Sequence, residues 1–269
     1  MKRSIQKFVR VDDTDGVSVD IYGDPDAPSI VVVPGVMSDA QSWRNVAESL
    51  TAWPSVAVVN RRGRYPSTPL SDDYGLHTEM ADLHRVLDAI GDPATLFGWS
   101  YGGLIALLVA RERSMEHLVA YEPVAPGFGS HALPALRRAA ADADWGRVVE
   151  IINRDVSGFS HGYVEGLRAD HATWTELMRL SKPLHAELEA LSRITIDGLI
   201  GAQANTIDLI IGANNVGVPP YGSTFEKIAA HLRGSSVHHL ADQGHLAHIE
   251  APTALARLID ELAPPRVCP

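Results

Sequence analysis

The stretch that decides the fold is ATLFGWSYGGLIALL, residues 94–108. An apolar run ends in Gly98-Trp99-Ser100-Tyr101-Gly102 and passes at once into a second apolar run. The spacing G-x-S-x-G at a strand-to-helix junction places its serine on a tight, strained bend. Small residues on both sides let the incoming helix approach the strand closely, which explains the glycines. The sequence therefore predicts that Ser100 is a nucleophile projecting beyond the edge of a sheet.

Strand-like and helix-like segments alternate on both sides of this junction. Short apolar runs rich in β-branched residues, at 29–35 and 55–60, predict strands buried on both faces. Residues 72–90 carry apolar side chains at intervals of three and four, which predicts a helix. The alternation returns between residues 206 and 262. The sequence thus predicts an α/β fold with a mostly parallel sheet flanked by helices.

Residues 127–203 interrupt the alternation. They carry helical patterns and several aromatic residues but no buried strand. We predict a core domain made of residues 1–126 and 204–269, with residues 127–203 inserted as a helical cap. An insertion at this point lies over the carboxyl edge of the sheet, where open α/β folds bind ligands.

Composition and charge exclude several classes of function. The chain has 269 residues, 45% of them hydrophobic, and a formal net charge of −10, which disfavours nucleic-acid and anionic-membrane partners. One cysteine, Cys268, excludes an internal disulfide. The sequence has no signal-like segment and no apolar run of about 20 residues, so we expect a cytoplasmic protein. We expect its partner to be a small-molecule substrate. The sequence has no phosphate-binding loop or metal-ligand cluster, so we expect no cofactor and no metal, and it favours no particular oligomeric state.

A candidate base for Ser100 lies near the C-terminus. A serine hydroxyl attacks only when a base takes its proton. The stretch ADQGHLAHIEAP, residues 241–252, places His245 after a predicted strand and before a terminal helix, where the scheme requires it. His248 is the alternative. We favour His245 because Gly244 precedes it and a helix begins near Glu250.

Together these motifs resemble the α/β-hydrolase family over almost the whole chain. In NRRGRYPST, one of the matching stretches, we interpret Arg62 and Gly63 as structural. The resemblance implies an α/β-hydrolase fold with a helical cap and a catalytic pair of Ser100 and His245. The stretches that carry it are VVVPGVMSDAQSW (31–43), NRRGRYPST (60–68), GWSYGG (98–103), LVAYEP (118–123), IIGANN (210–215) and GHLAHIEAP (244–252).

The resemblance also implies an oxyanion hole made of two backbone N–H groups. One belongs to Tyr101, directly after the nucleophile. The other is carried over to Val36 in the first loop, with Met37 as the alternative. Pro34-Gly35 stands where the family has His-Gly, so a side chain that often braces this loop is missing.

The triad acid departs from the family pattern. The family usually has an Asp where this chain has Asn215, and an asparagine cannot carry the charge that stabilises an imidazolium. Glu122, after the predicted strand at 117–121, is the substitute, and certain haloalkane dehalogenases take their acid from this place. We predict Glu122 as the catalytic acid. Asn215 as a neutral orienter, Asp208, Asp242 and the absence of any acid remain alternatives.

These residues favour acyl transfer to water. We expect a serine hydrolase acting on an ester, thioester or lactone bond of a small-to-medium apolar substrate, with Ser100 as nucleophile and His245 as base. The alternative is a non-hydrolytic enzyme, such as a lyase, eliminase, cyclase or decarboxylase of natural-product biosynthesis, in which His245 is a general base. A third class, a non-catalytic binder, has no need of a strained serine.

Overall fold

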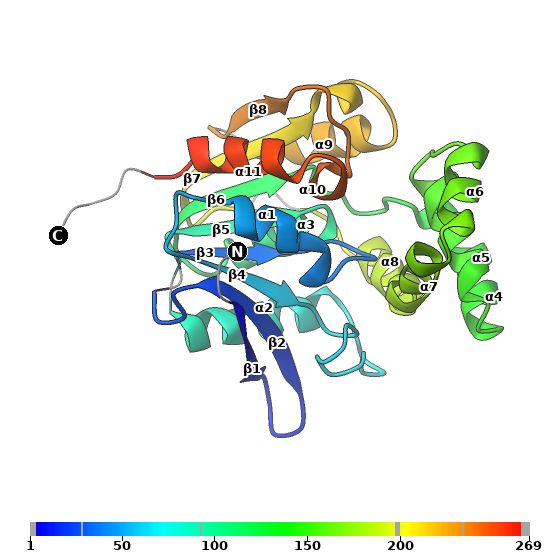
Figure 1. Ribbon diagram of the computed structural model, residues 1–269, viewed down its shortest axis with the longest axis horizontal. Coiled ribbons are helices and arrows are strands. Elements are labelled where there is room, and N and C mark those ends of the chain that lie inside the picture. The colour runs from blue at the N-terminus through cyan, green and yellow to red at the C-terminus, as the bar shows by residue number, and fades with distance from the viewer. Residues whose placement is uncertain (1–3, 28, 92, 197–199, 233, 265–269) are drawn as a thin grey trace.

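The computed structural model describes residues 4–27, 29–91, 93–196, 200–232 and 234–264. Its centre is an eight-stranded sheet with the strand order β1-β2-β4-β3-β5-β6-β7-β8 (Figure 1). The strands are β1 (Ser4–Arg10), β2 (Gly16–Gly23), β3 (Ile30–Val33), β4 (Ser55–Asn60), β5 (Thr95–Trp99), β6 (Met115–Tyr121), β7 (Ala204–Gly212) and β8 (Ser236–Leu240). The antiparallel pairs are β1 with β2 and β2 with β4, and the others are parallel. The predicted mostly parallel α/β sheet is confirmed.

Helices cover both faces of the sheet, which is why the central strands are buried along their whole length. One face packs against α1 and α11, with Trp43, Leu50 and Leu255 in its core. The other face packs against α2, α3 and α9, with Leu87 and Leu104 in its core. These helices are α1 (Arg44–Ser49), α2 (Leu76–Ile90), α3 (Tyr101–Val109), α9 (Tyr221–Ala229) and α11 (Pro252–Glu261), and the short α10 (Ala247–Glu250) precedes α11.

In the described part of the chain between β6 and β7, five α-helices group together at one side of the sheet (Figure 1). They are α4 (Leu133–Ala141), α5 (Trp145–Glu150), α6 (His161–Ala169), α7 (His171–Leu180) and α8 (Leu184–Ser192), and a π-helical segment at Ile151–Val156 continues α5. We call α4 to α8, with this segment, the cap helices. The division into a core of residues 1–126 and 204–269 and a cap of 127–203 stays a prediction.

Two helix boundaries differ from the sequence patterns for local reasons. The pattern at 72–90 becomes a helix only from Leu76, because Gly75 is extended (φ −163°) and its N–H donates to Thr78 Oγ1 at 3.2 Å. The helical pattern at 224–232 becomes α9, which begins three residues earlier at Tyr221, directly after Pro220. Cys268 lies outside the described residues. No helix in the described part of the chain is both long and apolar enough to cross a membrane.

The turn between β5 and α3 has almost no free space. Ser100 adopts φ 56° and ψ −121°, a conformation that non-glycine residues rarely take. A Cβ on Gly98 would lie 2.5 Å from the Gly102 carbonyl oxygen, and one on Gly102 would lie 2.1 Å from that of Val33. Glycine is therefore required at both positions, since α3 begins directly against the end of β3.

Gly102→Ala tests how tightly the turn between β5 and α3 is packed. Alanine in a helix is ordinarily more favourable than glycine by about 1 kcal/mol. Here the added methyl would collide with backbone, so we expect the free energy of unfolding to fall by roughly 1–3 kcal/mol. Gly166→Ala in α6 is the control, because nothing lies within 4 Å of its Cβ position. That variant should be stabilised by about 0.5–1 kcal/mol. Urea denaturation measures both, and equal effects would contradict the packing argument.

Candidate active site

Four predicted site residues meet at the carboxyl edge of the sheet. Ser100 follows β5, Glu122 follows β6, Asn215 ends a short helical turn after β7, and His245 lies between β8 and α10. These strands are parallel neighbours, so the loops that follow them emerge at the same edge. The structure thus brings together residues that are up to 145 positions apart in sequence.

The imidazole of His245 is held on several sides. Its Nδ1 lies 2.6 Å from Glu122 Oε2. The His245 ring stacks on that of Tyr221, with centroids 3.7 Å apart and planes at 13°. The Trp99 indole N–H donates to the backbone carbonyl of His245 at 3.0 Å. The Nδ1 contact leaves Nε2 as the ring nitrogen available for proton transfer. Tyr221 had no distinguishing signal in the sequence.

Glu122 is a buried carboxylate with a full set of donors. It is 0% exposed, and Oε1 accepts from the Gly212 N–H at 2.9 Å. The side-chain amide of Asn215 donates to Oε1 and Oε2 at 2.9 and 3.0 Å, and His245 completes the set. A charged group can be buried only with such partners. Asn215 is therefore positioned to support Glu122, and its amide binds this carboxylate instead of the imidazole.

The two aspartates that the sequence left open lie elsewhere. Asp208 is bonded to His117 Nε2 at 2.8 Å and to His238 Nε2 at 2.6 Å, in the middle of β7. Asp242 is exposed in a turn with φ 58°. Neither carboxylate contacts His245 among the described residues.

His248, the alternative base, is buried in an aromatic environment. Its ring stacks on Trp43, with centroids 4.9 Å apart and planes at 9°, and it also lies against Trp99. Burial lowers the pKa of His248 to about 3, and neighbouring His245 acts in the same direction. A histidine with so low a pKa stays neutral at pH 7 and is a weak base.

Ser100 and His245 line one cavity of about 190 Å³. The rest of its wall is mostly apolar and comes largely from the cap helices and their connections, including Phe128, Ile152, Phe159, Tyr163, Leu177 and Leu188. In the part of the chain that the structure describes, Ser100 Oγ makes no hydrogen bond to the His245 ring. Such contacts often tighten only when substrate binds. The same described residues contain no cluster of three His, Cys, Asp or Glu side chains suited to a metal ion.

The proposed oxyanion donors also border this cavity. Val36, Met37 and Tyr101 all line it. The loop carrying Val36 lies directly against Ser100, since a Cβ on Gly35 would be 2.9 Å from the Ser100 Cβ. Across the described residues, the N–H groups of Val36 and Tyr101 donate to no backbone carbonyl. Both are therefore available to a ligand.

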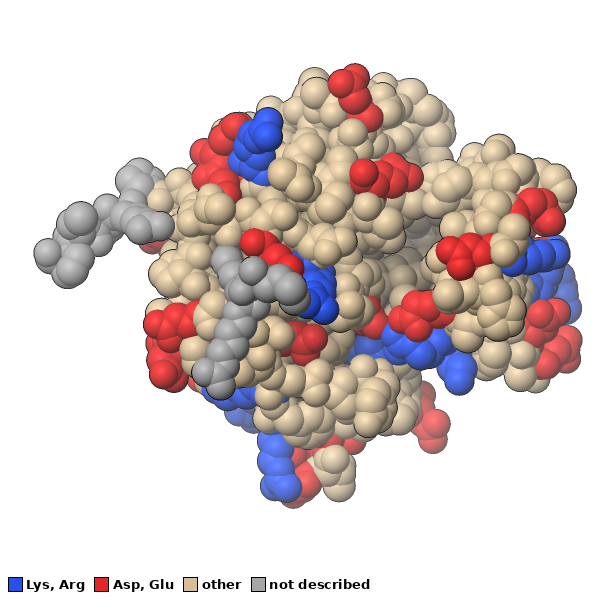
Figure 2. Space-filling model, viewed as in Figure 1, with Lys and Arg blue, Asp and Glu red and all other residues tan. Residues whose placement is uncertain are grey.

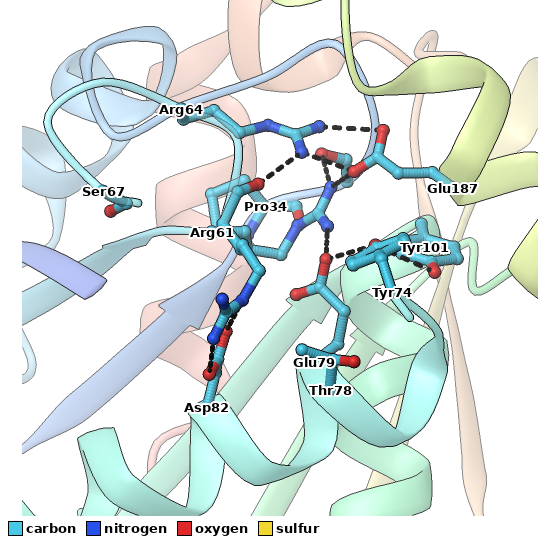
Figure 3. A network of polar contacts seen from close by, with 12 residues as sticks. Pro34, Arg61, Arg64, Ser67, Tyr74, Thr78, Glu79, Asp82, Tyr101 and Glu187 are labelled. Carbon is cyan, nitrogen blue, oxygen red and sulfur yellow. Dashed lines mark hydrogen bonds and ion pairs between the residues drawn. The ribbon is translucent and has the colours of Figure 1, made fainter. Parts of the chain in front are cut away.

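Arg61 is the residue that sequence reasoning missed. Its Nε donates to the Pro34 carbonyl oxygen and its Nη2 to that of Gly35, each at 2.8 Å (Figure 3). This guanidinium therefore braces the loop at Pro34-Gly35. The signal was present in NRRGRY, which puts three arginines directly after a fully buried strand. Neighbouring Arg62 instead pairs with Asp82 through two bonds of 2.8 Å.

Comparison with known proteins identifies similar chains. Residues 30–258 match the model of a family described as the alpha/beta hydrolase family. An N-formylmaleamate deformylase from Pseudomonas putida is 31% identical over 55% of this chain and 53% of its own length. A 2-heptyl-3-hydroxy-4-quinolone dioxygenase from Rhodococcus erythropolis is 25% identical over 88% of this chain and 86% of its own.

Other matches are partial in sequence or limited to the fold. A polyketide synthase from Burkholderia thailandensis is 33% identical over 42% of this chain, and the match spans only 6% of the synthase. The chain thus spans about half or less of the curated relatives it matches with at least 31% identity. An enol-lactonase structure from Burkholderia xenovorans superposes with a TM-score of 0.78 at 17% identity, covering 95% of this chain and 98% of that one.

Replacing the buried acid tests its role. We expect Glu122→Gln to lower kcat/KM by ~10²–10⁴, because the amide leaves a developing imidazolium uncompensated. Asp208→Asn is the matched control, since it removes another carboxylate that binds histidines, outside the cavity. Its kcat/KM should stay within about threefold. Steady-state kinetics on a p-nitrophenyl ester compare the two, and equal losses would remove Glu122 from the mechanism.

Moving the acid to position 215 gives a second test. Asn215→Asp alone would set two carboxylates about 3 Å apart in a buried site, so we expect lower activity and lower stability. The double variant Glu122→Gln, Asn215→Asp restores one carboxylate and one amide in exchanged places. It should be more active than either single variant when kcat/KM is compared at one pH. A double variant no better than Glu122→Gln would mean that the position of the charge, and not only its presence, is essential.

Proposed function

This chain belongs to the α/β-hydrolase family, and from that premise we propose that it is a serine hydrolase acting on an ester, thioester or lactone bond. The observation that carries the proposal is the 2.6 Å contact of His245 Nδ1 with the buried Glu122, at the cavity that Ser100 lines. A histidine oriented by a carboxylate beside a strained serine is the arrangement that activates a hydroxyl.

The proposed reaction proceeds in two halves. Ser100 Oγ attacks the carbonyl carbon while its proton passes to His245 Nε2, and Glu122 stabilises the resulting imidazolium. The N–H groups of Tyr101 and Val36 hold the oxyanion, a contribution of about 3 kcal/mol for each donor. The carbon–leaving-group bond then breaks as His245 returns the proton to the leaving group. Water, activated by the same histidine, cleaves the acyl-enzyme.

The cavity favours a small-to-medium apolar substrate. Its volume is about 190 Å³, and aromatic and aliphatic side chains form most of its wall. The deformylase relative supports hydrolytic chemistry. On the face shown in Figure 2, basic side chains are scattered among acidic ones, and the net charge is −10. Both observations support a small-molecule substrate over nucleic acid or an anionic membrane. A cytoplasmic location remains part of the proposal.

A second candidate is proton abstraction without acylation. In that reaction His245 takes a proton from an acidic group of the substrate and Ser100 only binds it by a hydrogen bond. Ser100 Oγ makes no hydrogen bond to the His245 ring in the described chain, and this reaction, unlike acylation, requires none. The similarity to a dioxygenase supports non-hydrolytic chemistry on this scaffold.

A serine-directed probe separates the two candidates. We expect a fluorophosphonate to add one phosphonyl group to the purified protein, detected by intact mass, because His245 makes Ser100 nucleophilic. Ser100→Ala should prevent labelling. Ser181→Ala, at a buried serine outside the cavity, should not. An unlabelled wild-type protein that also leaves p-nitrophenyl esters intact would exclude the hydrolase and favour proton abstraction.

A further inference from the structure

Arg61 joins the loop of the proposed oxyanion hole to the cap helices. Besides its bonds to the Pro34 and Gly35 carbonyls, its Nη1 donates to Glu79 Oε1 of α2 at 2.5 Å. Its Nη2 donates to Glu187 Oε1 of α8 at 2.7 Å (Figure 3). Arg61 is 3% exposed, so its guanidinium is removed from water.

The contact with Gly35 acts on the N–H that the mechanism requires. The Gly35 carbonyl and the Val36 N–H belong to one planar, trans peptide group, so they point in opposite directions. Fixing the carbonyl on one side fixes the direction of the N–H on the other. A cation on the carbonyl oxygen also polarises the peptide, which makes the N–H a stronger donor.

The position of Arg61 depends in turn on Glu187. This carboxylate is 0% exposed and also accepts from Arg64, at 2.5 Å on Oε1 and 3.1 Å on Oε2. Burial alone would raise the pKa of Glu187, but Arg64 and Arg61 lower it, so the carboxylate is ionised. Burial alone would lower the pKa of Arg61, but Glu79 and Glu187 raise it. The guanidinium therefore stays charged at every working pH.

Carboxylate pairing alone does not account for this arrangement. Glu79 and Glu187 would neutralise Arg61 without any contact to the loop. Two of its four bonds nevertheless go to consecutive carbonyls, beside the nucleophile. Only a planar guanidinium offers donors in enough fixed directions to hold all four acceptors at once.

We infer that Arg61 is a positioning residue for the oxyanion hole, aiming the Val36 N–H through the Gly35 carbonyl, and that Glu187 of the cap holds it in place. The inference rests on the proposed function, because it takes Val36 as an oxyanion donor.

Comparing Arg61→Lys with Arg62→Lys tests it. Both substitutions keep the charge and remove a fork of bonds to buried carboxylates, but only Arg61 contacts the loop. We expect Arg61→Lys to lower kcat on a p-nitrophenyl ester and the affinity for a trifluoromethyl ketone, an analogue of the tetrahedral intermediate, by about 10- to 100-fold. Its KM should change less than about threefold, and Arg62→Lys should keep all three values within about threefold.

The pH profile and a second variant complete the test. Because Arg61 does not titrate, Arg61→Lys should lower the plateau of kcat/KM without moving its midpoint. If Arg61→Lys does not fold, as judged by near-ultraviolet circular dichroism, Glu187→Gln replaces it. That variant should reduce kcat and analogue affinity about 3- to 10-fold at unchanged KM, because Arg61 loses one anchor.

The outcomes distinguish this inference from the proposed function. A wild-type protein that neither hydrolyses esters nor reacts with a fluorophosphonate overturns both. If the wild-type protein does both, the positioning role alone is overturned when Arg61→Lys and Arg62→Lys have the same kcat and analogue affinity. Where Glu187→Gln replaces Arg61→Lys, wild-type kcat and analogue affinity in that variant overturn it. A selective loss of analogue affinity in the Arg61 or Glu187 variant supports it.

Discussion

The close approach of α3 to the end of β3 is the constraint on which the rest of the site depends. The helix can begin there only because Gly98 and Gly102 lack side chains, and Ser100 takes a strained backbone conformation as a result. Strain of this kind persists only where the surroundings over-determine it. The carbonyl oxygens that crowd Gly102 are those of Val33 and Pro34, which lead into the loop carrying Val36. Backbone contacts thus fix the position of Ser100 relative to the loop that carries Val36.

The second constraint is electrostatic. A buried site next to one histidine has room for one carboxylate. Here that carboxylate is Glu122, after β6, and an amide, that of Asn215, follows β7. The amide is a suitable partner for Glu122, because its two N–H groups donate hydrogen bonds, which a second carboxylate could not do. The asparagine that looked like a defect in the sequence is thus part of a consistent hydrogen-bond set. The Gly212 N–H completes it from the backbone.

Local patterns were enough to predict the sheet, the elbow and the family, because each depends on residues close together in sequence. G-x-S-x-G at an apolar junction and β-branched runs are signals of this kind. The same patterns placed Glu122 first as the acid but left alternatives open, because Glu122 and His245 are 123 residues apart and only the fold gives their distance. Arg61 was missed because NRRGRY places three arginines after β4 but does not show which of them reaches the loop after β3. The roles of Ser100, His245, Glu122, Val36 and Tyr101 stay predictions.

The stacking of Tyr221 on His245 bears on the conformational entropy of the histidine side chain. An imidazole fixed at one nitrogen by a carboxylate and covered on one face by a phenol ring has little freedom to rotate about its own axis. Tyr221 is itself tethered, because its hydroxyl donates to Ser157 Oγ at 2.8 Å, in the segment after the π-helical turn. The cost of ordering the ring was therefore met when the chain folded, before any ligand enters the cavity that His245 lines.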